Sequence, residues 1–344
     1  MSTNGLCGEV RWECPSNIAL VKYWGKKGEQ LPQNPSISFT LSRCTTTTSV
    51  NFEMAPEFAS EFYFEGKPNP IFHDKITGFI AKHIEDFPAL KTLKCTISSS
   101  NSFPHSSGIA SSASSMCALV MCLMDIERMA RGEEMINLTK ASSLARLASG
   151  SASRSVYPKA ALWGRTDILR DSSDLYAIDI SQHLHSVFED YKDTILVVSD
   201  AEKAVSSRAG HDLMNGNPFA ESRYDQARCH TEALLSALNS GDVDTFISIV
   251  EAEALQLHAL MMCSSPSFIL MRPASLAIIE RIRRYRHDND IPVCFTLDAG
   301  PNVHVLYPSS YAVEVRKFIE SELSEYCVNR YYIHDEVGQG PRRC

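Results

Sequence analysis

The sequence predicts an α+β fold of two packed domains, in which mixed or antiparallel sheets pack against helices in two layers. Three observations support this prediction. The length of 344 residues exceeds the usual size of a single hydrophobic core. The contents of 44% hydrophobic and 22% charged residues are those of an ordinary globular protein. Strand-like and helix-like segments are intermixed without strict βαβ alternation, which disfavours a doubly wound parallel sheet.

The first half of the chain carries mainly strand patterns. Alternating or β-branched runs predict strands over Gly8–Cys14, Ser36–Leu41, Thr45–Phe52 and Lys94–Ser99. We expect Glu61–Phe64 to be the hairpin partner of Thr45–Phe52. Apolar residues at helical spacing predict three helices, namely Asp74–Ile84, Ala110–Arg131 and Leu138–Leu147.

The second half begins with an apolar run over Thr194–Ser199, which predicts a buried strand. Long amphipathic patterns then predict helices over Ala220–Asn239, Val243–Met262, Ala274–Asp288 and Ser310–Glu325. Further strands are expected at Val293–Leu297, Val303–Tyr307 and Asn329–His334. We place the domain boundary near residue 190, which gives an N-terminal domain over 1–190 and a C-terminal domain over 191–344.

Composition excludes several classes of function. The formal net charge of −8 argues against general binding of nucleic acid, because phosphate-backbone binding needs an excess of Lys and Arg. Residues Met1–Arg11 lack an apolar signal region, and the most apolar stretch, Met116–Met124, is about half as long as a membrane span. The eleven cysteines form no Cys-x-x-Cys pair, which favours reduced thiols in a cytoplasmic protein over disulfides or a zinc site.

The strongest local signal is the Ser- and Gly-containing loop Pro104–Ala113, between a predicted strand and a predicted helix. A helix N-terminus offers unpaired N–H groups and partial positive charge to an anion, and glycine lets the backbone approach a phosphate closely. A Ser-rich turn with an N-cap is the alternative, and both interpretations stay open on this loop alone. The candidate nucleotide-binding residues are Pro104, Ser107, Gly108, Ala110, Ser111 and Ser112.

Two further segments combine small residues with a charge. Ser149–Ser155 contains Arg154, whose guanidinium matches a carboxylate or phosphate, although a surface loop with a solvated arginine is the simpler interpretation. Asp298–Asn302 directly follows the predicted strand Val293–Leu297. A carboxylate at the end of a buried strand suits catalysis, and these residue types equally suit a β-turn.

Two more segments carry cations beside hydroxyls or aromatic rings. Asn17–Lys26 places two lysines four residues apart with Tyr23 and Trp24 between them, and it forms either an anion pocket or a solvated face. Lys203–Gly210 follows the strand Thr194–Ser199 and repeats the combination of hydroxyls, cations and a glycine. Its polarity suits a lid, and a loop with incidental charges is the alternative.

In this order, the five segments resemble the GHMP kinase superfamily, and within it the diphosphomevalonate decarboxylases. Pro104–Ala113 is similar to Pro-x-x-x-Gly-Leu-x-Ser-Ser-Ala, with Ile109 in place of the leucine. Asn17–Lys26 is similar to the decarboxylase motif Asn-Ile-Ala-x-x-Lys-Tyr-Trp-Gly-Lys, and Val337–Pro341 is similar to the closing Val-Gly-x-Gly-Pro. His105 departs from the threonine of many members. The resemblance spans nearly the whole chain.

The resemblance implies a GHMP-type two-domain fold with the active site in the cleft between the domains. It also implies ATP-dependent conversion of mevalonate 5-diphosphate to isopentenyl diphosphate, ADP, phosphate and CO2. We expect Mg2+ as the metal from the chemistry of ATP rather than from a ligand motif. By resemblance, Asp298 orients or deprotonates the 3-hydroxyl, Arg154 holds the substrate carboxylate, and Lys22 assists near the reacting oxygen. The residues implied to contact the substrate's diphosphate and polar groups are Tyr23, Lys26, Ser149, Ser151, Ser207 and Arg208.

On the nucleotide side, the resemblance places Ser111 near ATP and the metal ion, and it brings Lys203 towards ATP. It implies a homodimer as the usual form. A phosphomevalonate decarboxylase and a mevalonate-type kinase remain alternatives, because such relatives share much of this pattern. A catalytically silent binding protein on the same fold is a third interpretation. The presence of Lys22, Arg154 and Asp298 favours the complete decarboxylase reaction.

Overall fold

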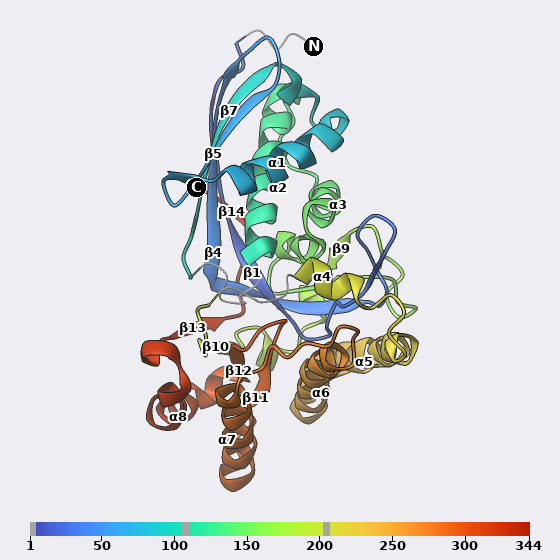
Figure 1. Cartoon of the computed structure of the whole chain (residues 1–344), viewed down its shortest axis with the longest axis vertical. Helices are drawn as coiled ribbons and strands as arrows, with labels where there is room; N and C mark the ends of the chain where they lie inside the picture. Colours follow the sequence, from blue (N-terminus) through green and yellow to red (C-terminus); the bar gives the residue numbers. More distant parts are fainter. Residues whose placement is uncertain (1–4, 105–110, 202–206) are drawn as a thin grey trace.

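The computed structural model describes residues 5–104, 111–201 and 207–344. Its described residues form a large mixed sheet in the upper half of Figure 1 and a smaller antiparallel sheet in the lower half. The large sheet has the order β14-β1-β4-β7-β5-β6, with β8 beside β4 and β9 beside β8. Its strands are β1 (Gly8–Ala19), β4 (Ser36–Met54), β5 (Ala59–Phe64), β6 (Lys67–Pro68), β7 (Leu93–Asn101), β8 (Ala160–Trp163), β9 (Ala177–Asp179) and β14 (Arg342–Arg343). The sequence patterns did not predict β8 and β9.

Strand β4 is one continuous strand of 19 residues, where the sequence predicts two strands, Ser36–Leu41 and Thr45–Phe52. Neither glycine nor proline interrupts the intervening residues. The buried carboxylate of Asp335 accepts the backbone N–H groups of Ser42, Arg43 and Cys44, at 2.8, 2.8 and 2.7 Å. These donors therefore find a partner from the C-terminal half of the chain, and the strand continues through them.

The predicted hairpin between Glu61–Phe64 and Thr45–Phe52 is wrong. Strand β7 lies between β4 and β5, and β5 pairs with β7 in parallel register. Alternate residues of β7, Leu93, Cys95 and Ile97, are all buried, whereas β5 buries only Phe62. The strand with the fuller apolar face takes the inner place in the sheet.

Helices cover one face of the large sheet, as Figure 1 shows. They are α1 (Pro70–Lys82), α2 (Ser111–Arg131), α3 (Leu138–Ala148) and the 3-10 helix η3 (Gly150–Val156). Helix α1 begins four residues before the predicted start, because Asn69 caps it by accepting the N–H of Phe72 and proline occupies its first position. Helix α2 is buried along most of its length and forms the centre of this core.

The smaller sheet has the order β11-β12-β10-β13 and is antiparallel throughout. Its strands are β10 (Lys192–Leu196), β11 (Cys294–Thr296), β12 (Val303–Tyr307) and β13 (Tyr332–Glu336). The helices around it are α5 (Ala220–Ser240), α6 (Val243–Met262), α7 (Pro273–Asn289) and α8 (Ala312–Phe318). Most of these bounds lie within two residues of the predicted ones.

In this half, the bounds of three predicted elements differ from those in the structure. The buried strand predicted over Thr194–Ser199 ends at Leu196, where its pairing with both neighbours stops. The strand predicted from Asn329 begins only at Tyr332, because Asn329 and Arg330 have φ of 51° and 54° and a left-handed backbone does not continue a strand. The helix predicted over Ser310–Glu325 is divided into four pieces: η6 (Ser309–Tyr311), α8, the π-helix η7 (Ile319–Leu323) and η8 (Ser324–Tyr326).

One apolar cluster, the shared core, contains residues of both halves. Ile18 and Phe39 from the large sheet pack in the same apolar cluster as Phe188, Phe246 and Ile195. Phe39 lies 5.9 Å from Phe246 between ring centroids. The domain boundary near residue 190 stays a prediction. No α-helix among the described residues is both long enough and apolar enough to cross a membrane.

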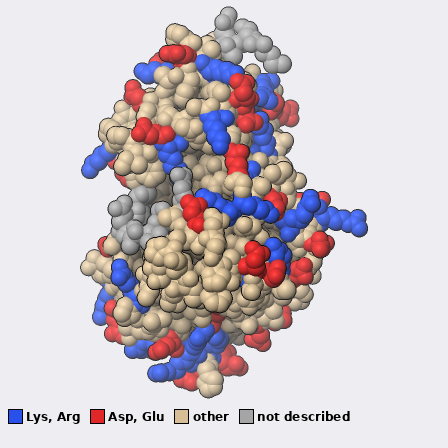
Figure 2. All heavy atoms as spheres, turned by 45° about the vertical axis from the view of Figure 1, so that its right-hand side comes forward, with Lys and Arg blue, Asp and Glu red and all other residues tan. Residues whose placement is uncertain are grey.

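Acidic and basic side chains are interspersed over the face that Figure 2 presents.

Candidate active site

Lys22 and Asp298 form an ion pair that joins the two halves of the chain. Lys22 follows β1 and Asp298 follows β11, and the two residues are separated by 276 positions. Lys22 Nζ donates to Asp298 Oδ1 at 2.9 Å and to the carbonyl oxygen of Ala19 at 2.6 Å. The lysine side chain is 2% exposed and the aspartate side chain is 24% exposed, so the pair presents its carboxylate towards solvent.

Arg154 lies on η3 and is almost completely buried. Its Nε donates to Ser38 Oγ at 3.0 Å and its Nη2 to Asn17 Oδ1 at 3.3 Å, while Nη1 has no hydrogen-bond partner among the described residues. Burial lowers the pKa of Arg154 to about 10, partly offset by the nearby charge of Asp298. The guanidinium is therefore still a cation at neutral pH, and one of its donors is available to an anion.

Tyr23 lies against η3 beside this arginine. An added Cβ at Gly150 would lie 2.9 Å from Tyr23 Cε1 and 3.0 Å from Tyr23 Oη, so glycine is required for this close approach. The phenol oxygen is buried without a hydrogen-bond partner in the part of the chain that the structure describes. Burial raises the pKa of Tyr23 well above its ordinary value, so the group remains an O–H donor.

The N-terminal end of α2 lies next to the beginning of η3. Ser149 Oγ donates to Ser112 Oγ at 3.4 Å. Asn17 Nδ2 donates to the carbonyl oxygen of Ser151 at 3.1 Å and to Ser155 Oγ at 2.7 Å. The expected nucleotide segment and the expected substrate segment thus meet, although 37 residues separate these two serines.

Lys26 lies at the edge of an open cleft of about 360 Å³ between α1, the β2–β3 hairpin (Lys26–Lys27 and Leu31–Pro32) and the end of α3. Lys75 and Lys82 line the same cleft, against one acidic residue, Glu29, which pairs with Lys82. Such an excess of cations around a cleft attracts a polyanion. Its volume lies within the range of small-molecule sites.

The short helix α4 (Ser207–Asp212) packs on the segment that contains Tyr23 and Lys26, where the sequence predicts a loop over Lys203–Gly210. His211 Nδ1 accepts the backbone N–H of Gly25 at 3.0 Å, and its ring centroid lies 4.3 Å from that of Tyr23. Lys26 Nζ lies 3.4 Å from Asp212 Oδ1. Burial, and secondarily the charge of Lys26, lower the pKa of His211 to about 3, so this imidazole is neutral and accepts the N–H.

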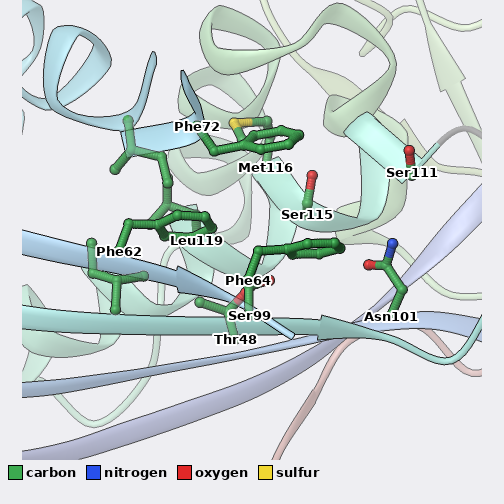
Figure 3. A pocket seen from close by; sticks show the side chains of 12 residues that line it. Thr48, Phe62, Phe64, Phe72, Ser99, Asn101, Ser111, Ser115, Met116 and Leu119 are labelled. Carbon is green, nitrogen blue, oxygen red and sulfur yellow. The ribbon is translucent and has the colours of Figure 1, made fainter. Parts of the chain in front are cut away.

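A second, narrow cavity of about 20 Å³ lies between the large sheet and the N-terminal half of α2. Figure 3 shows the rings of Phe62, Phe64 and Phe72 around it, with the polar side chains of Asn101 and Ser111 at one end. Met116 lines both this cavity and the basic cleft, so the two hollows adjoin the same stretch of α2.

The structure describes only part of the predicted set of site residues. Ser107, Gly108, Ala110 and Lys203 lie outside the described residues. Pro104 and Ser111 flank the first of these gaps. Helix α4 contains Ser207 and Arg208, and its position brings this segment of the chain to the site.

Among the described residues, no group of three or more His, Cys, Asp or Glu side chains is arranged to hold a metal ion.

The sequence patterns missed residues that support the site from behind. Asn17 is part of a recognised motif, yet only the structure shows that it holds both η3 and Arg154. Glu253 and His258 on α6 bond to the backbones of Lys22 and Asp298. His211 and Trp163 pack against Tyr23. Two glutamates, Glu251 and Glu253, interrupt the apolar pattern of α6, and this signal points to both of them.

Comparisons with known proteins show the family of this chain. Residues 14–174 match the model of the diphosphomevalonate decarboxylase-like N-terminal domain, and residues 194–343 match that of the mevalonate 5-diphosphate decarboxylase C-terminal domain. The diphosphomevalonate decarboxylase of Ganoderma lucidum is 30% identical over 329 residues, which cover 89% of this chain and 80% of the relative. The chain belongs to the diphosphomevalonate decarboxylase family.

Solved structures of the family share the fold over the whole chain. Mevalonate diphosphate decarboxylase from Staphylococcus aureus has a TM-score of 0.85 at 27% identity and is covered to 100%, as is this chain. A solved complex of a related protein, MDDEF, with MVAPP, AMPPCP and magnesium has a TM-score of 0.83 at 29% identity, covering 98% of this chain and 99% of the other. The predicted α+β class is confirmed.

Proposed function

We propose that this protein catalyses the ATP-dependent decarboxylation of mevalonate 5-diphosphate, giving isopentenyl diphosphate, ADP, phosphate and CO2. Family membership supports the reaction class. The observation that carries the proposal is Arg154, a fully buried cation with a donor that no described residue uses, beside an aspartate–lysine pair. Burying a cation is costly, and an anionic ligand that accepts from it offsets that cost.

The first step is transfer of the ATP γ-phosphoryl group to the tertiary 3-hydroxyl. Asp298 accepts the hydroxyl hydrogen bond and takes its proton or orients its oxygen towards phosphorus. Lys22 holds the aspartate oxygen at 2.9 Å and supplies positive charge beside the reacting oxygen. Lys22 and Asp298 follow strands that are packed in the core of the protein. This packing keeps the distance between the two side chains constant.

The second step breaks the C3–O bond and then the bond to the carboxylate. Phosphate leaves with any proton that Asp298 took from the hydroxyl, so Asp298 is anionic when positive character develops at the tertiary carbon and stabilises it. The carboxylate departs as CO2, and its bonding electron pair forms the new double bond. Arg154 holds the carboxylate until that point through Nη1, the donor that no described residue uses.

The remaining residues hold the phosphate groups. Tyr23, Lys26, Ser149 and Ser151 would offer hydroxyl or ammonium donors to the substrate's diphosphate, with Ser207 and Arg208 on α4 as further candidates. Six donors of this kind suit a group that carries several negative charges.

The basic cleft and the N-terminal end of α2 fit ATP. The cleft provides Lys75 and Lys82 for the phosphates of ATP. The hydroxyl of Ser111, together with phosphate oxygens and water, is the ligand set that Mg2+ prefers. When bound, Mg2+ neutralises charge on the transferred phosphoryl group. A solved relative holds AMPPCP and magnesium, which supports both cofactors.

The test is CO2 release from mevalonate 5-diphosphate with ATP and Mg2+, compared with mevalonate 5-phosphate. We expect stoichiometric CO2 and ADP with the diphosphate. A stable 3-phosphate product without CO2 would instead identify a kinase, and preferred turnover of the monophosphate would identify a phosphomevalonate decarboxylase.

We also infer a homodimer in the cytoplasm, acting on a small molecule and not on nucleic acid or membranes. The family resemblance supports the dimer. The free state of all eleven thiols supports a reducing compartment. Light scattering after size-exclusion chromatography tests the dimer, because a mass near 38.2 kDa would show a monomer.

A further inference from the structure

Helix α6 contacts both partners of the catalytic ion pair through their backbones. Glu253 Oε2 accepts the backbone N–H of Lys22 at 2.8 Å. His258 Nε2 lies 3.1 Å from the carbonyl oxygen of Asp298. A carbonyl oxygen only accepts, so this nitrogen carries a proton and donates it. The two α6 residues are five positions apart, about 7.5 Å along the helix axis.

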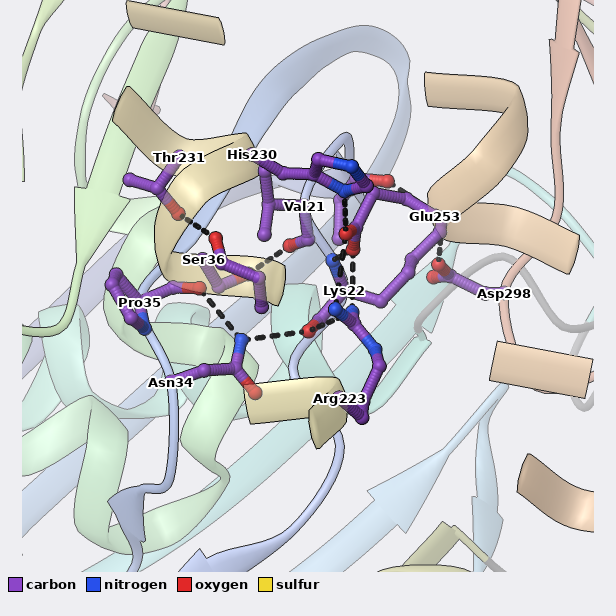
Figure 4. Close-up of polar contacts among 12 residues, drawn as sticks. Val21, Lys22, Asn34, Pro35, Ser36, Arg223, His230, Thr231, Glu253 and Asp298 are labelled. Carbon is purple, nitrogen blue, oxygen red and sulfur yellow. Dashed lines mark hydrogen bonds and ion pairs between the residues drawn. The ribbon is translucent and has the colours of Figure 1, made fainter. Parts of the chain in front are cut away.

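Glu253 is itself held firmly. Figure 4 shows its carboxylate surrounded by Arg223, His230 and the backbone of Lys22. Arg223 donates to both carboxylate oxygens, to Oε1 at 3.0 Å and to Oε2 at 2.5 Å, and His230 Nδ1 lies 2.6 Å from Oε1. Burial raises the pKa of Glu253, but the hydrogen bond from His230 and the charge of Arg223 outweigh this and leave the pKa lowered. Glu253 is therefore a carboxylate with all its donors supplied by the protein.

The backbone of Lys22 is fixed on its other side as well. Its carbonyl oxygen accepts from Asn34 Nδ2 at 3.1 Å and from Arg223 Nη2 at 3.4 Å. The side chain of Arg223 thus bonds both to Glu253 and to the residue that Glu253 holds. The N–H and the C=O of Lys22 belong to the two peptide units on either side of its Cα. Because both units are held, the start of the lysine side chain is fixed.

We propose that α6 acts as a spacer that sets the separation of Lys22 from Asp298, with Glu253 and His258 as positioning residues. Glu253 holds the backbone of Lys22, and His258 holds the backbone of Asp298. The ammonium–carboxylate contact of 2.9 Å is then a consequence of two backbone contacts made by one rigid helix. The inference rests on the proposed function in one respect, because that function is what makes Lys22 and Asp298 the catalytic pair.

The main experiment measures kcat and KM for CO2 release in Glu253→Gln, His258→Leu and His258→Gln. We expect kcat to fall by about 10- to 100-fold in Glu253→Gln and His258→Leu, since a small displacement of a catalytic group costs up to that much, with KM little changed. His258→Gln is expected to recover most of the rate, because its amide nitrogen reaches the position of Nε2. Equal losses in the two His258 variants would overturn the proposal.

Glu251→Gln is the matched control. Glu251 lies two residues away on the same helix, is also buried, and bonds to Arg283 and Arg286 on α7 rather than to the site. We expect it to lower thermal stability as much as Glu253→Gln does while kcat stays within about twofold. If Glu251→Gln slows turnover as much as Glu253→Gln, the effect is one of general stability and the spacer role is refuted.

Two further measurements separate this inference from the proposed function. In an Asp298→Asn background, His258→Leu should lower the residual rate no further, because it acts through Asp298; additive losses would contradict this. Acetylation of Lys22, followed by peptide mass spectrometry, needs no turnover. The buried amine should react at least several-fold faster in Glu253→Gln than in wild type and Glu251→Gln. Unchanged labelling refutes the spacer, whereas a wild type without CO2 release refutes only the proposed reaction.

Discussion

Replacing Arg154 by methionine is expected to abolish turnover while leaving the fold about as stable as before. Burial lowers the pKa of this guanidinium to about 10, against about 12.5 in water. At about 1.4 kcal/mol for each pKa unit, holding the charge in place costs about 3 kcal/mol of folding free energy. Folded and unfolded forms are both protonated below pH 10, so the whole cost is present at pH 7 and is lost only as pH rises through 10.

Methionine fills a similar volume without the charge. Its substitution also removes the bonds to Ser38 and Asn17, which contribute about 1 kcal/mol each, so the two effects nearly cancel. We therefore expect the unfolding free energy of Arg154→Met to lie within about 1 kcal/mol of wild type, from urea titration at pH 7. CO2 release should fall by more than about 100-fold, because the substrate carboxylate loses its partner.

Arg146→Met provides the comparison. Arg146 is also buried, but it donates to the carbonyl oxygens of Leu175 at 2.8 Å and Glu29 at 2.5 Å, and so it holds the surrounding loops. Burial lowers the pKa of Arg146 as well, so removal of its charge offsets part of the loss of these two bonds, and we expect Arg146→Met to be less stable than wild type by up to about 2 kcal/mol. If Arg154→Met is destabilised as much as Arg146→Met, Arg154 is a structural residue and the reasoning fails.

Three other predictions follow from the site. Asp298→Ala should lower kcat by at least about 100-fold with little change in substrate affinity, measured by steady-state kinetics and calorimetry; weaker binding at normal kcat would contradict its role. Gly150→Ala should raise KM for the diphosphate, because the new methyl group meets the Tyr23 ring at 2.9 Å; a normal KM would show that the ring moves freely. His211 has a pKa of about 3 in the folded protein, below its unfolded value, so its contribution to stability is complete above about pH 6.5 and is lost as pH falls towards 3. His211→Gln should flatten the fall in unfolding free energy between pH 6 and 4, and an unchanged slope would exclude this titration.

The long local elements were predictable because their signals are local. Helix α6 occupies the predicted residues Val243–Met262, and β12 the predicted Val303–Tyr307. Apolar periodicity records which face is buried, and that face is decided within one element. The pairing of β5 was not predictable in this way. Its partner β7 begins 29 residues after β5 ends, and the competition for the inner position depends on the apolar faces of both strands.

The sequence by itself determined which chemical groups we propose for the reaction, since the motifs around Lys22, Arg154 and Asp298 are short and contiguous. The tertiary structure decided what those groups meet. Only the packing of η3 under β1 buries Arg154 and leaves one of its donors unused, and only the shared core brings Lys22 to Asp298 across 276 positions. The reason is physical: burial and ion pairing depend on distances between segments, and a chain encodes those distances through its whole core rather than through any one motif.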